Sequence, residues 1–193
     1  MLSVNKFTMD YVKKFTHNYE LGWPIDIQVD FNLKKSIRNI LVLGGGTNIL
    51  NNKLTSIIRR LINKSEYKVY SSNMLLSTFL FHKNLIKFNF TTEEFKKIDL
   101  IIARPGLGTI TDAVTYNIPI LTIFESNNKE MKFNADAVSN NNFGFNINND
   151  IHQIEKKVDE MVFKNKYASC QRSLSKENKN GLADFTNFIN DKL

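Results

Sequence analysis

The sequence predicts an α/β fold, a doubly wound parallel sheet covered by helices on both faces. From Ile40 onward, short runs of Ile, Leu and Val alternate with segments whose apolar residues recur at helical spacing. Runs this short and this apolar are typical of parallel strands that are buried on both faces. Two of the runs end in glycine-rich loops, "LGGGT" and "RPGLGT". The 193 residues are enough for one good core and leave little for a second.

The predicted elements follow one another in a regular order. Apolar runs predict strands at 39–43, 67–72, 85–90, 99–104, 119–124 and 143–147. Helical spacing predicts helices at 49–63, 92–98, 109–117 and 129–138, another from residue 151 onward, and a last one at 181–191. Thr91 and Glu94 form a capping box at the start of the second helix. Because strands alternate with helices of about this length, we expect parallel β-α-β connections.

Residues 1–36 lack this pattern and are predicted to be a lead-in or linker segment outside the core. Segment 9–15 has the pattern of one or two helical turns, and Trp23-Pro24 is a break typical of a connector. Residues 37–193 are then predicted to form a single domain. The chain after residue 169 is polar up to the last predicted helix.

The charge of the chain favours anionic partners. Lys and Arg number 26 against 19 Asp and Glu, which gives a net charge of +7. Such a surface attracts phosphorylated ligands, nucleic acid or an anionic membrane. The lysines are scattered, however, and no basic run carries interleaved aromatic residues, so we expect solvated surfaces and no nucleic-acid partner. Peripheral contact with an anionic membrane stays open.

Cysteine content and hydropathy indicate the compartment. Cys170 is the only cysteine, so no internal disulfide can form and a reducing compartment is expected. No charged-then-apolar leader opens the chain, and no apolar run reaches the roughly 18 residues that a membrane span needs. We therefore expect a soluble cytoplasmic protein, with any membrane contact peripheral and on the inner face.

The two glycine-rich loops are the strongest candidates for a binding site. One loop holds Gly45 and Gly46, with Thr47 or Asn48 as the expected N-cap of the next helix; the other holds Gly106 and Gly108, with Thr109 at the expected helix start. Glycines allow backbone amides to approach a phosphate closely, and a helix N-terminus favours an anion. Neither loop matches a Walker motif or a complete G-x-G-x-x-G fingerprint. Tight turns without a ligand are the alternative.

Asp112 and Arg104 flank the second loop. Asp112 is expected one turn into the helix, where it either compensates the helix dipole or accepts two hydrogen bonds from a ribose diol. Arg104, at the end of the preceding strand, either binds a phosphate or pairs with Asp112. Spacing alone does not separate these alternatives.

The segment "DLIIARPGLGTITDAVTYNIPILTI", followed by "NADAV" and "FGFNI", resembles the nucleotide-sugar-binding C-terminal domain of GT-B glycosyltransferases, especially the family 28 enzymes that resemble the peptidoglycan N-acetylglucosaminyltransferase. The resemblance covers 37–163 and rests on the joint order of several short motifs. The matching positions are Asp99, Ala103, Arg104, Gly106, Thr109, Asp112, Ala113, Pro119, Asn134, Ala135 and Gly144.

The resemblance implies a Rossmann-like domain, one half of a GT-B fold, that binds a UDP-sugar without a metal ion or other cofactor. It places Asp112 at the ribose hydroxyls and Glu130 in the sugar-contacting stretch, where the family commonly has paired glutamines. Phe88, Asn89 and Phe90 are expected to meet the uracil edge through their backbone. The remaining residues expected at the nucleotide-sugar are Gly45, Gly46, Thr47, Arg104, Gly106, Gly108, Thr109 and Asn134.

The resemblance also implies that this chain carries only part of an enzyme. GT-B enzymes bind the acceptor in a separate N-terminal domain, which 193 residues cannot also hold. His17, His82 and His152 have no partner carboxylate at useful spacing, so no catalytic base is assigned. We expect hexosyl transfer only together with an acceptor-binding domain or subunit, and little or none from the chain alone. The alternatives are a nucleotide-sugar hydrolase or epimerase of the same fold, and a non-catalytic partner module.

Overall fold

A six-stranded, all-parallel sheet forms the centre of the protein, with strand order β5-β4-β3-β6-β7-β8. The computed structural model describes residues 2–3, 19–25, 27, 29–44, 49–72, 82–147, 152 and 154–191. The strands of the main sheet are β3 (Asn39–Leu43), β4 (Lys68–Ser71), β5 (Leu85–Lys87), β6 (Leu100–Ala103), β7 (Ile120–Thr122) and β8 (Gly144–Asn146). A separate parallel pair joins β1 (Leu2–Ser3) to β2 (Tyr19–Glu20). The expected fold class, a doubly wound parallel sheet, is confirmed.

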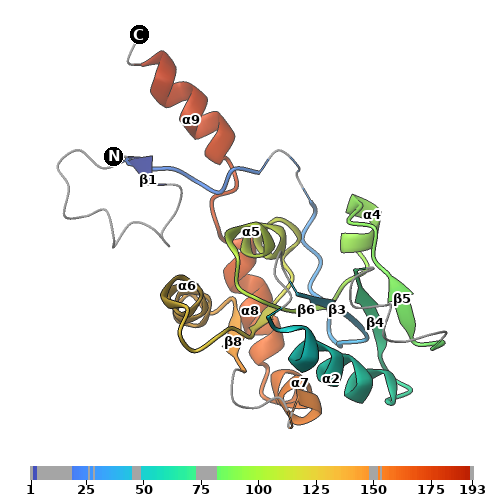
Figure 1. Ribbon diagram of the computed structural model, residues 1–193. Helices are drawn as coiled ribbons and strands as arrows, with labels where there is room; N and C mark the ends of the chain where they lie inside the picture. The colour runs from blue at the N-terminus through green and yellow to red at the C-terminus, as the bar shows by residue number, and fades with distance from the viewer. Residues whose placement is uncertain are drawn as a thin grey trace.

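Helices cover both faces of this sheet (Figure 1). They are α2 (Asn51–Ile62), α4 (Thr92–Phe95), α5 (Leu107–Tyr116), α6 (Lys129–Asn140), α7 (Ile154–Phe163), α8 (Lys166–Ser175) and α9 (Gly181–Asn190). In Figure 1, α5 lies on one side of the strands, α2 and α7 lie on the other, and α9 stands away from the sheet. Within the described residues, no helix combines the length and the apolar character that crossing a lipid bilayer requires.

Two hydrophobic clusters hold the layers together. Along β3, Ile40 and Val42 join the cluster beneath α2 and α7, whereas Leu41 and Leu43 join the cluster beneath α5. Alternate residues of one strand thus enter opposite layers, which explains the continuous apolar runs at 40–43 and 100–103. In α2, the buried positions recur at the helical spacing that predicted this helix from the sequence: Leu54, Ile57, Ile58, Leu61 and Ile62.

Three sequence-based expectations need correction. The chain after residue 169 is not simply polar, because α8 spans 166–175 and buries Tyr167, Cys170, Gln171 and Leu174. Its buried positions are too few and too mixed to have stood out as an apolar pattern. The second and third corrections concern helix starts: α2 begins at Asn51 after Leu50, and α5 begins at Leu107 after Gly106, so Thr109 is the third residue of α5.

The lead-in segment contributes to the core, contrary to expectation. Trp23 is 2% exposed and, with Ile25, belongs to the cluster beneath α5. Its backbone N–H donates to the carbonyl of Asn178 at 2.7 Å, and the N–H of Gly181 donates to the carbonyl of Trp23 at 2.9 Å. The start of α9 is therefore tied to the lead-in segment. The segment 9–15 lies outside the described residues, and the boundary at residue 37 stays a prediction.

Asp99 fastens the lead-in segment to the amino edge of the sheet, the edge at which the parallel strands begin. Its Oδ2 accepts hydrogen bonds from the backbone N–H groups of Arg38 (2.9 Å) and Asn39 (2.8 Å), and its Oδ1 pairs with Lys34 Nζ at 2.9 Å. The Tyr167 hydroxyl donates to the carbonyl of Asp99 at 2.9 Å. This acid, part of the family pattern in the sequence, therefore has a structural explanation.

Asp99→Ala should destabilise the protein by about 2–3 kcal/mol, because two backbone donors and the Lys34 ammonium lose their acceptor. Urea unfolding measures the free energy of unfolding. Glu93→Ala is the matched control, since Glu93 pairs with Lys96 at 2.8 Å on the open surface and should be dispensable. Equal stability of the two variants would show that Asp99 does not fasten the lead-in segment.

Candidate functional site

The chain reverses its winding direction between β3 and β6. From β3 the chain moves outward to β4 and β5, then returns to β6 on the other side of β3 and continues to β7 and β8. Leu43, the last residue of β3, pairs with Ala103, the last residue of β6. In open parallel sheets, ligands bind beyond the carboxyl ends of the strands at such a switch point. Gly44 and Arg104 are the next residues after these strands, so both glycine-rich loops start side by side.

Three of the residues expected in the first loop, Gly45, Gly46 and Thr47, lie outside the described residues. Gly44 precedes them and is buried. The second loop is described in full. The structure therefore shows that the two loops begin close together. The contacts of the first loop with a ligand stay a prediction.

The N-terminus of α5 presents unused hydrogen-bond donors at the switch point. Gly106 is the N-cap residue in an extended conformation, and no side chain caps the helix. Among the described residues, the backbone N–H groups of Leu107, Gly108 and Thr109 have no acceptor. A Cβ atom built at Gly106 or Gly108 would meet nothing within 4 Å, so folding does not require glycine at either position. This open helix end has the donors and the partial positive charge that an anion needs.

Asp112 lies in the second turn of α5 and is partly buried. Helical side chains point back toward the N-terminus, so its carboxyl group lies over the turn that holds Gly108 and Thr109. The described residues offer this carboxyl group no hydrogen-bond or ion-pair partner, and burial raises its pKa to about 6. An acid kept without a partner beside an open helix end can accept hydrogen bonds from a ligand.

Arg104 pairs with Glu125 and not with Asp112. The Arg104 Nε donates to Glu125 Oε2 at 3.1 Å, and the two side chains are 17% and 10% exposed. Within the described part of the chain, the two terminal NH₂ groups of Arg104 have no other partner. The alternative of an Arg104–Asp112 pair is thereby excluded, and the guanidinium keeps donors for a phosphate.

Glu125 is the first residue of the stretch 125–135 that the resemblance places at the sugar, but the sequence analysis assigned it no role of its own. It follows β7 at the carboxyl edge of the sheet, the edge at which the strands end. A cavity of about 380 Å³ is lined by Glu125, Ile49, Asn127, Asn128 and Lys129. The available signal was a charged residue shortly after a buried strand, as for Arg104.

The neighbouring α6 contains two further residues expected at the ligand. Asn134 is 4% exposed and donates from its side chain to the carbonyl of Pro105 at 2.9 Å, so it holds the loop between β6 and α5 in place. Glu130 is exposed in the first turn of α6, and Met131 after it is buried. Asn134 thus has a structural role in shaping the site, whereas Glu130 stays at its rim.

The segment after β5 lies at the far edge of the sheet. Phe88 is 2% exposed, and its N–H donates to the carbonyl of Ser71 at 2.9 Å. Asn89 donates to Glu94 from its backbone N–H at 2.5 Å and from its side chain at 2.9 Å. Phe90 is exposed and has a left-handed backbone with φ of 59°. The N–H groups of Phe88 and Asn89 are therefore already used, which leaves the N–H of Phe90 and the carbonyls for the expected base contact.

The expected capping box before α4 is confirmed in part. The Thr91 side chain accepts from the backbone N–H of Glu94 at 3.3 Å. The Glu94 carboxylate reaches back to Asn89, two residues before the N-cap, instead of to Thr91 itself. The effect is to fix the turn between β5 and α4.

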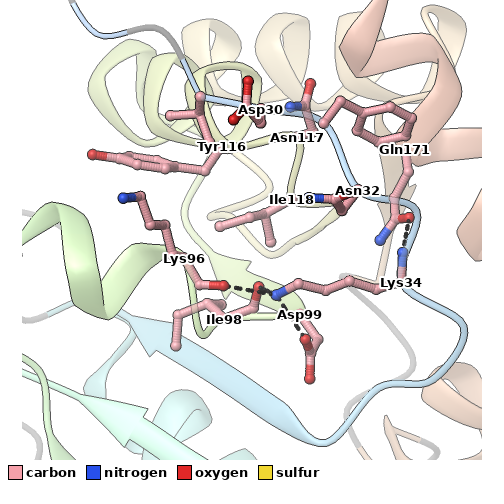
Figure 2. Close-up of a pocket in the computed structure, with 12 residues that line it drawn as sticks. Asp30, Asn32, Lys34, Lys96, Ile98, Asp99, Tyr116, Asn117, Ile118 and Gln171 are labelled. Carbon is pink, nitrogen blue, oxygen red and sulfur yellow. Dashed lines mark hydrogen bonds and ion pairs between the residues drawn. The ribbon is translucent and has the colours of Figure 1, made fainter.

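A second cavity lies at the amino edge of the sheet, away from the glycine-rich loops. Its volume is about 360 Å³, and its lining includes Asp30, Lys96, Asp99 and Tyr116. Figure 2 shows Lys34 reaching across this cavity to Asp99 and to the carbonyls beside it. Its polar groups serve the attachment of the lead-in segment.

Metal ligands do not gather in the part of the chain that the structure describes: no three His, Cys, Asp or Glu side chains there could hold a metal ion. The expectation that no metal or cofactor takes part stays a prediction.

Comparison with known proteins identifies the domain type. Residues 39–187 match the model of the glycosyltransferase family 28 C-terminal domain. No curated protein matched the sequence.

Solved glycosyltransferase structures share the fold. The calicheamicin glycosyltransferase CalG4 is similar with a TM-score of 0.66 and 11% identity, over 94% of this chain and 48% of that one. The spinosyn rhamnosyltransferase SpnG, complexed with thymidine diphosphate, is similar with a TM-score of 0.65 and 13% identity, over 90% of this chain and 52% of that one. The glycosyltransferase of kitacinnamycin is similar with a TM-score of 0.63 and 14% identity, over 87% of this chain and 46% of that one. The chain spans about half the length of these structures, and at such identities the similarity is one of fold.

Asp112→Asn should stabilise the ligand-free protein at neutral pH. The folded pKa of about 6 exceeds the ordinary 3.8, so between these values the unfolded carboxyl ionises first and stability falls as pH rises. The full shift corresponds to about 3 kcal/mol, and partial exposure reduces the expected gain to about 1–2 kcal/mol.

Urea unfolding of both proteins at pH 4.5, 6.0 and 7.5 should show the gain growing with pH. Asp136→Asn, at an exposed position of α6, is the control and should show no such trend. If the two proteins differ in their free energy of unfolding by the same amount at every pH, burial does not raise the pKa of the Asp112 carboxyl group.

Proposed function

The chain belongs to the glycosyltransferase family 28 C-terminal domain, and from this we propose that it is the donor-binding half of a GT-B glycosyltransferase and binds a UDP-sugar. The observation that carries the proposal lies at the switch point between β3 and β6. There an open helix end stands beside the carboxyl group of Asp112, which has no partner among the described residues. The first feature suits a diphosphate, and the second suits a ribose.

The N-terminus of α5 would bind the diphosphate. Gly106 and Gly108 leave the backbone N–H groups of the first turn open to an anion, and the Thr109 hydroxyl adds a donor. Arg104, held by Glu125 through Nε, can donate from its terminal NH₂ groups. Gly45, Gly46 and Thr47 would approach the same phosphates from the loop after β3.

Asp112 would hold the ribose. A carboxylate accepts two hydrogen bonds from the 2′- and 3′-hydroxyls, as acids do in dinucleotide sites. These bonds would also give the buried carboxylate of Asp112 partners that the ligand-free domain lacks. That SpnG was crystallised with thymidine diphosphate supports a nucleoside diphosphate ligand in this fold. The ribose preference of Asp112 favours the ribonucleotide UDP, with the base near Phe88, Asn89 and Phe90.

Transfer of the hexosyl group would need an acceptor-binding domain or subunit. This chain corresponds to about half of the similar glycosyltransferases. The N-terminus of α5 would stabilise the departing UDP without a metal, and a base from the acceptor part would deprotonate the acceptor. The net charge of +7 would favour peripheral contact of a cytoplasmic assembly with an anionic membrane. Alone, the chain is expected to bind donor and to transfer little or none of it.

Calorimetric titration with UDP and 2′-deoxy-UDP tests the ribose assignment. UDP should bind about 10-fold more tightly, because the deoxynucleotide lacks one donor to the Asp112 carboxylate. Asp112→Ala should weaken UDP binding about 10-fold or more and abolish this preference, whereas Asp136→Ala should change neither. If no nucleotide binds, or if Asp112→Ala binds UDP as well as the parent does, the proposed function is wrong.

Gly108→Ala should separate folding from binding. A Cβ at this position meets nothing, and alanine in place of a helical glycine should stabilise the fold by up to about 1 kcal/mol. The same methyl group would stand where a phosphate approaches the α5 amides, so we expect UDP affinity to fall about 10-fold. Thermal unfolding and titration of one preparation measure both effects; unchanged UDP affinity would place the diphosphate elsewhere.

A further inference from the structure

The backbone fixes Glu125 at the carboxyl edge of the sheet, beside the proposed diphosphate position. The N–H of Ile123 donates to the carbonyl of Ala103 at 3.0 Å, which continues the pairing of β7 with β6 beyond the strand ends. The carbonyl of Glu125 then accepts from the N–H of Asn128 at 3.0 Å, in a turn that leads into α6. Arg104 and Glu125 are thus brought together by the sheet itself.

Among the described residues, one oxygen of the Glu125 carboxylate has no hydrogen-bond partner. Oε2 accepts from Arg104 Nε, whereas Oε1 is shielded from solvent and makes no hydrogen bond. The whole side chain is only 10% exposed. A buried acceptor left unpaired costs about 1–3 kcal/mol, so a native protein that keeps one commonly does so for a ligand.

The cavity beside Glu125 has room for a ligand group. It is a shallow depression, widely open to solvent, with a volume of about 380 Å³. It lies between the start of α2, at Ile49, and the start of α6, at Asn128 and Lys129. The same carboxyl edge carries the α5 N-terminus, so a group attached to the diphosphate can extend toward Glu125.

We propose that Glu125 determines donor specificity by accepting a hydrogen bond from a hydroxyl group of the donor sugar, with Arg104 as the positioning residue that holds its carboxylate. This proposal rests on the proposed function and names the class of sugar. A carboxylate only accepts hydrogen bonds, so the sugar must present a hydroxyl donor. A neutral hexose or N-acetylhexosamine satisfies this requirement, whereas a uronic acid brings a second carboxylate toward Glu125.

Glu130, the acid expected in the sugar-contacting stretch, is less suited to this role. Glu130 is exposed and lies in the first turn of α6, where a negative charge already interacts favourably with the helix dipole. Its exposed carboxylate stays at the rim of the site as a second candidate for a sugar contact.

Glu125→Gln and the control variant Asp136→Asn, made in the full chain, test the assignment. Calorimetry would use UDP, UDP-glucose, UDP-N-acetylglucosamine and UDP-glucuronic acid. The parent should prefer a neutral UDP-sugar to UDP-glucuronic acid. Glu125→Gln should weaken binding of that neutral sugar nucleotide about 10-fold and change UDP binding by no more than about twofold, because glutamine still accepts from Arg104. Asp136→Asn, at an exposed position of α6 outside the proposed ligand contacts, should leave both affinities unchanged.

The outcomes separate this proposal from the proposed function. If UDP itself does not bind the parent, the proposed function fails and the specificity role fails with it. If UDP binds and Glu125→Gln weakens UDP and the UDP-sugar by the same factor, or weakens neither, Glu125 does not contact the sugar and the proposal is overturned. Thermal unfolding checks that Glu125→Gln folds. If it does not fold, Glu125→Asp, which keeps the charge on a shorter side chain, takes its place and should show the same selective loss of UDP-sugar binding.

Discussion

The pairing of β3 with β6 is the constraint on which the candidate site depends. These two strands are neighbours in space but lie on either side of two other strands in the sequence. Their pairing places Gly44 beside Arg104 and directs the start of α5 to the same edge. The proposed contacts with the diphosphate and the ribose follow from this one register. A slip of β6 against β3 would separate the loops even if each kept its local structure.

The two edges of the sheet differ in how completely their polar groups are satisfied. At the amino edge, Asp99 has three hydrogen-bonded partners, and Lys34 contacts two carbonyls in addition to Asp99. At the carboxyl edge, Asp112 has no partner among the described residues and Glu125 keeps one oxygen unpaired. The first arrangement contributes stability, whereas the second costs stability in the absence of a ligand. This contrast assigns attachment to one edge and binding to the other, although both edges have cavities.

The sequence predicted most of the fold because the strands and α2 carry strong local patterns. The buried strands contain continuous apolar runs such as 40–43, and α2 repeats its apolar residues at helical spacing. The sequence failed for α8 and Trp23, whose burial depends on contacts with distant parts of the chain. The site was predicted from its glycines and from Asp112, which have local signals. Glu125 was assigned no role of its own because its significance arises only from Arg104, 21 residues away, and from an oxygen that the fold leaves unpaired.

Arg104 links the two halves of the proposed ligand. Its Nε donates to Glu125, the acid proposed to contact the sugar, and its terminal NH₂ groups have no partner among the described residues and could bind the diphosphate. A guanidinium can serve both because its donors diverge in one rigid plane, which the single ammonium of lysine cannot reproduce. Binding of the diphosphate would draw positive charge from the ion pair and strengthen the acceptor character of the Glu125 carboxylate. Diphosphate and sugar would then bind cooperatively, through a pair of side chains positioned by the neighbouring strands β6 and β7.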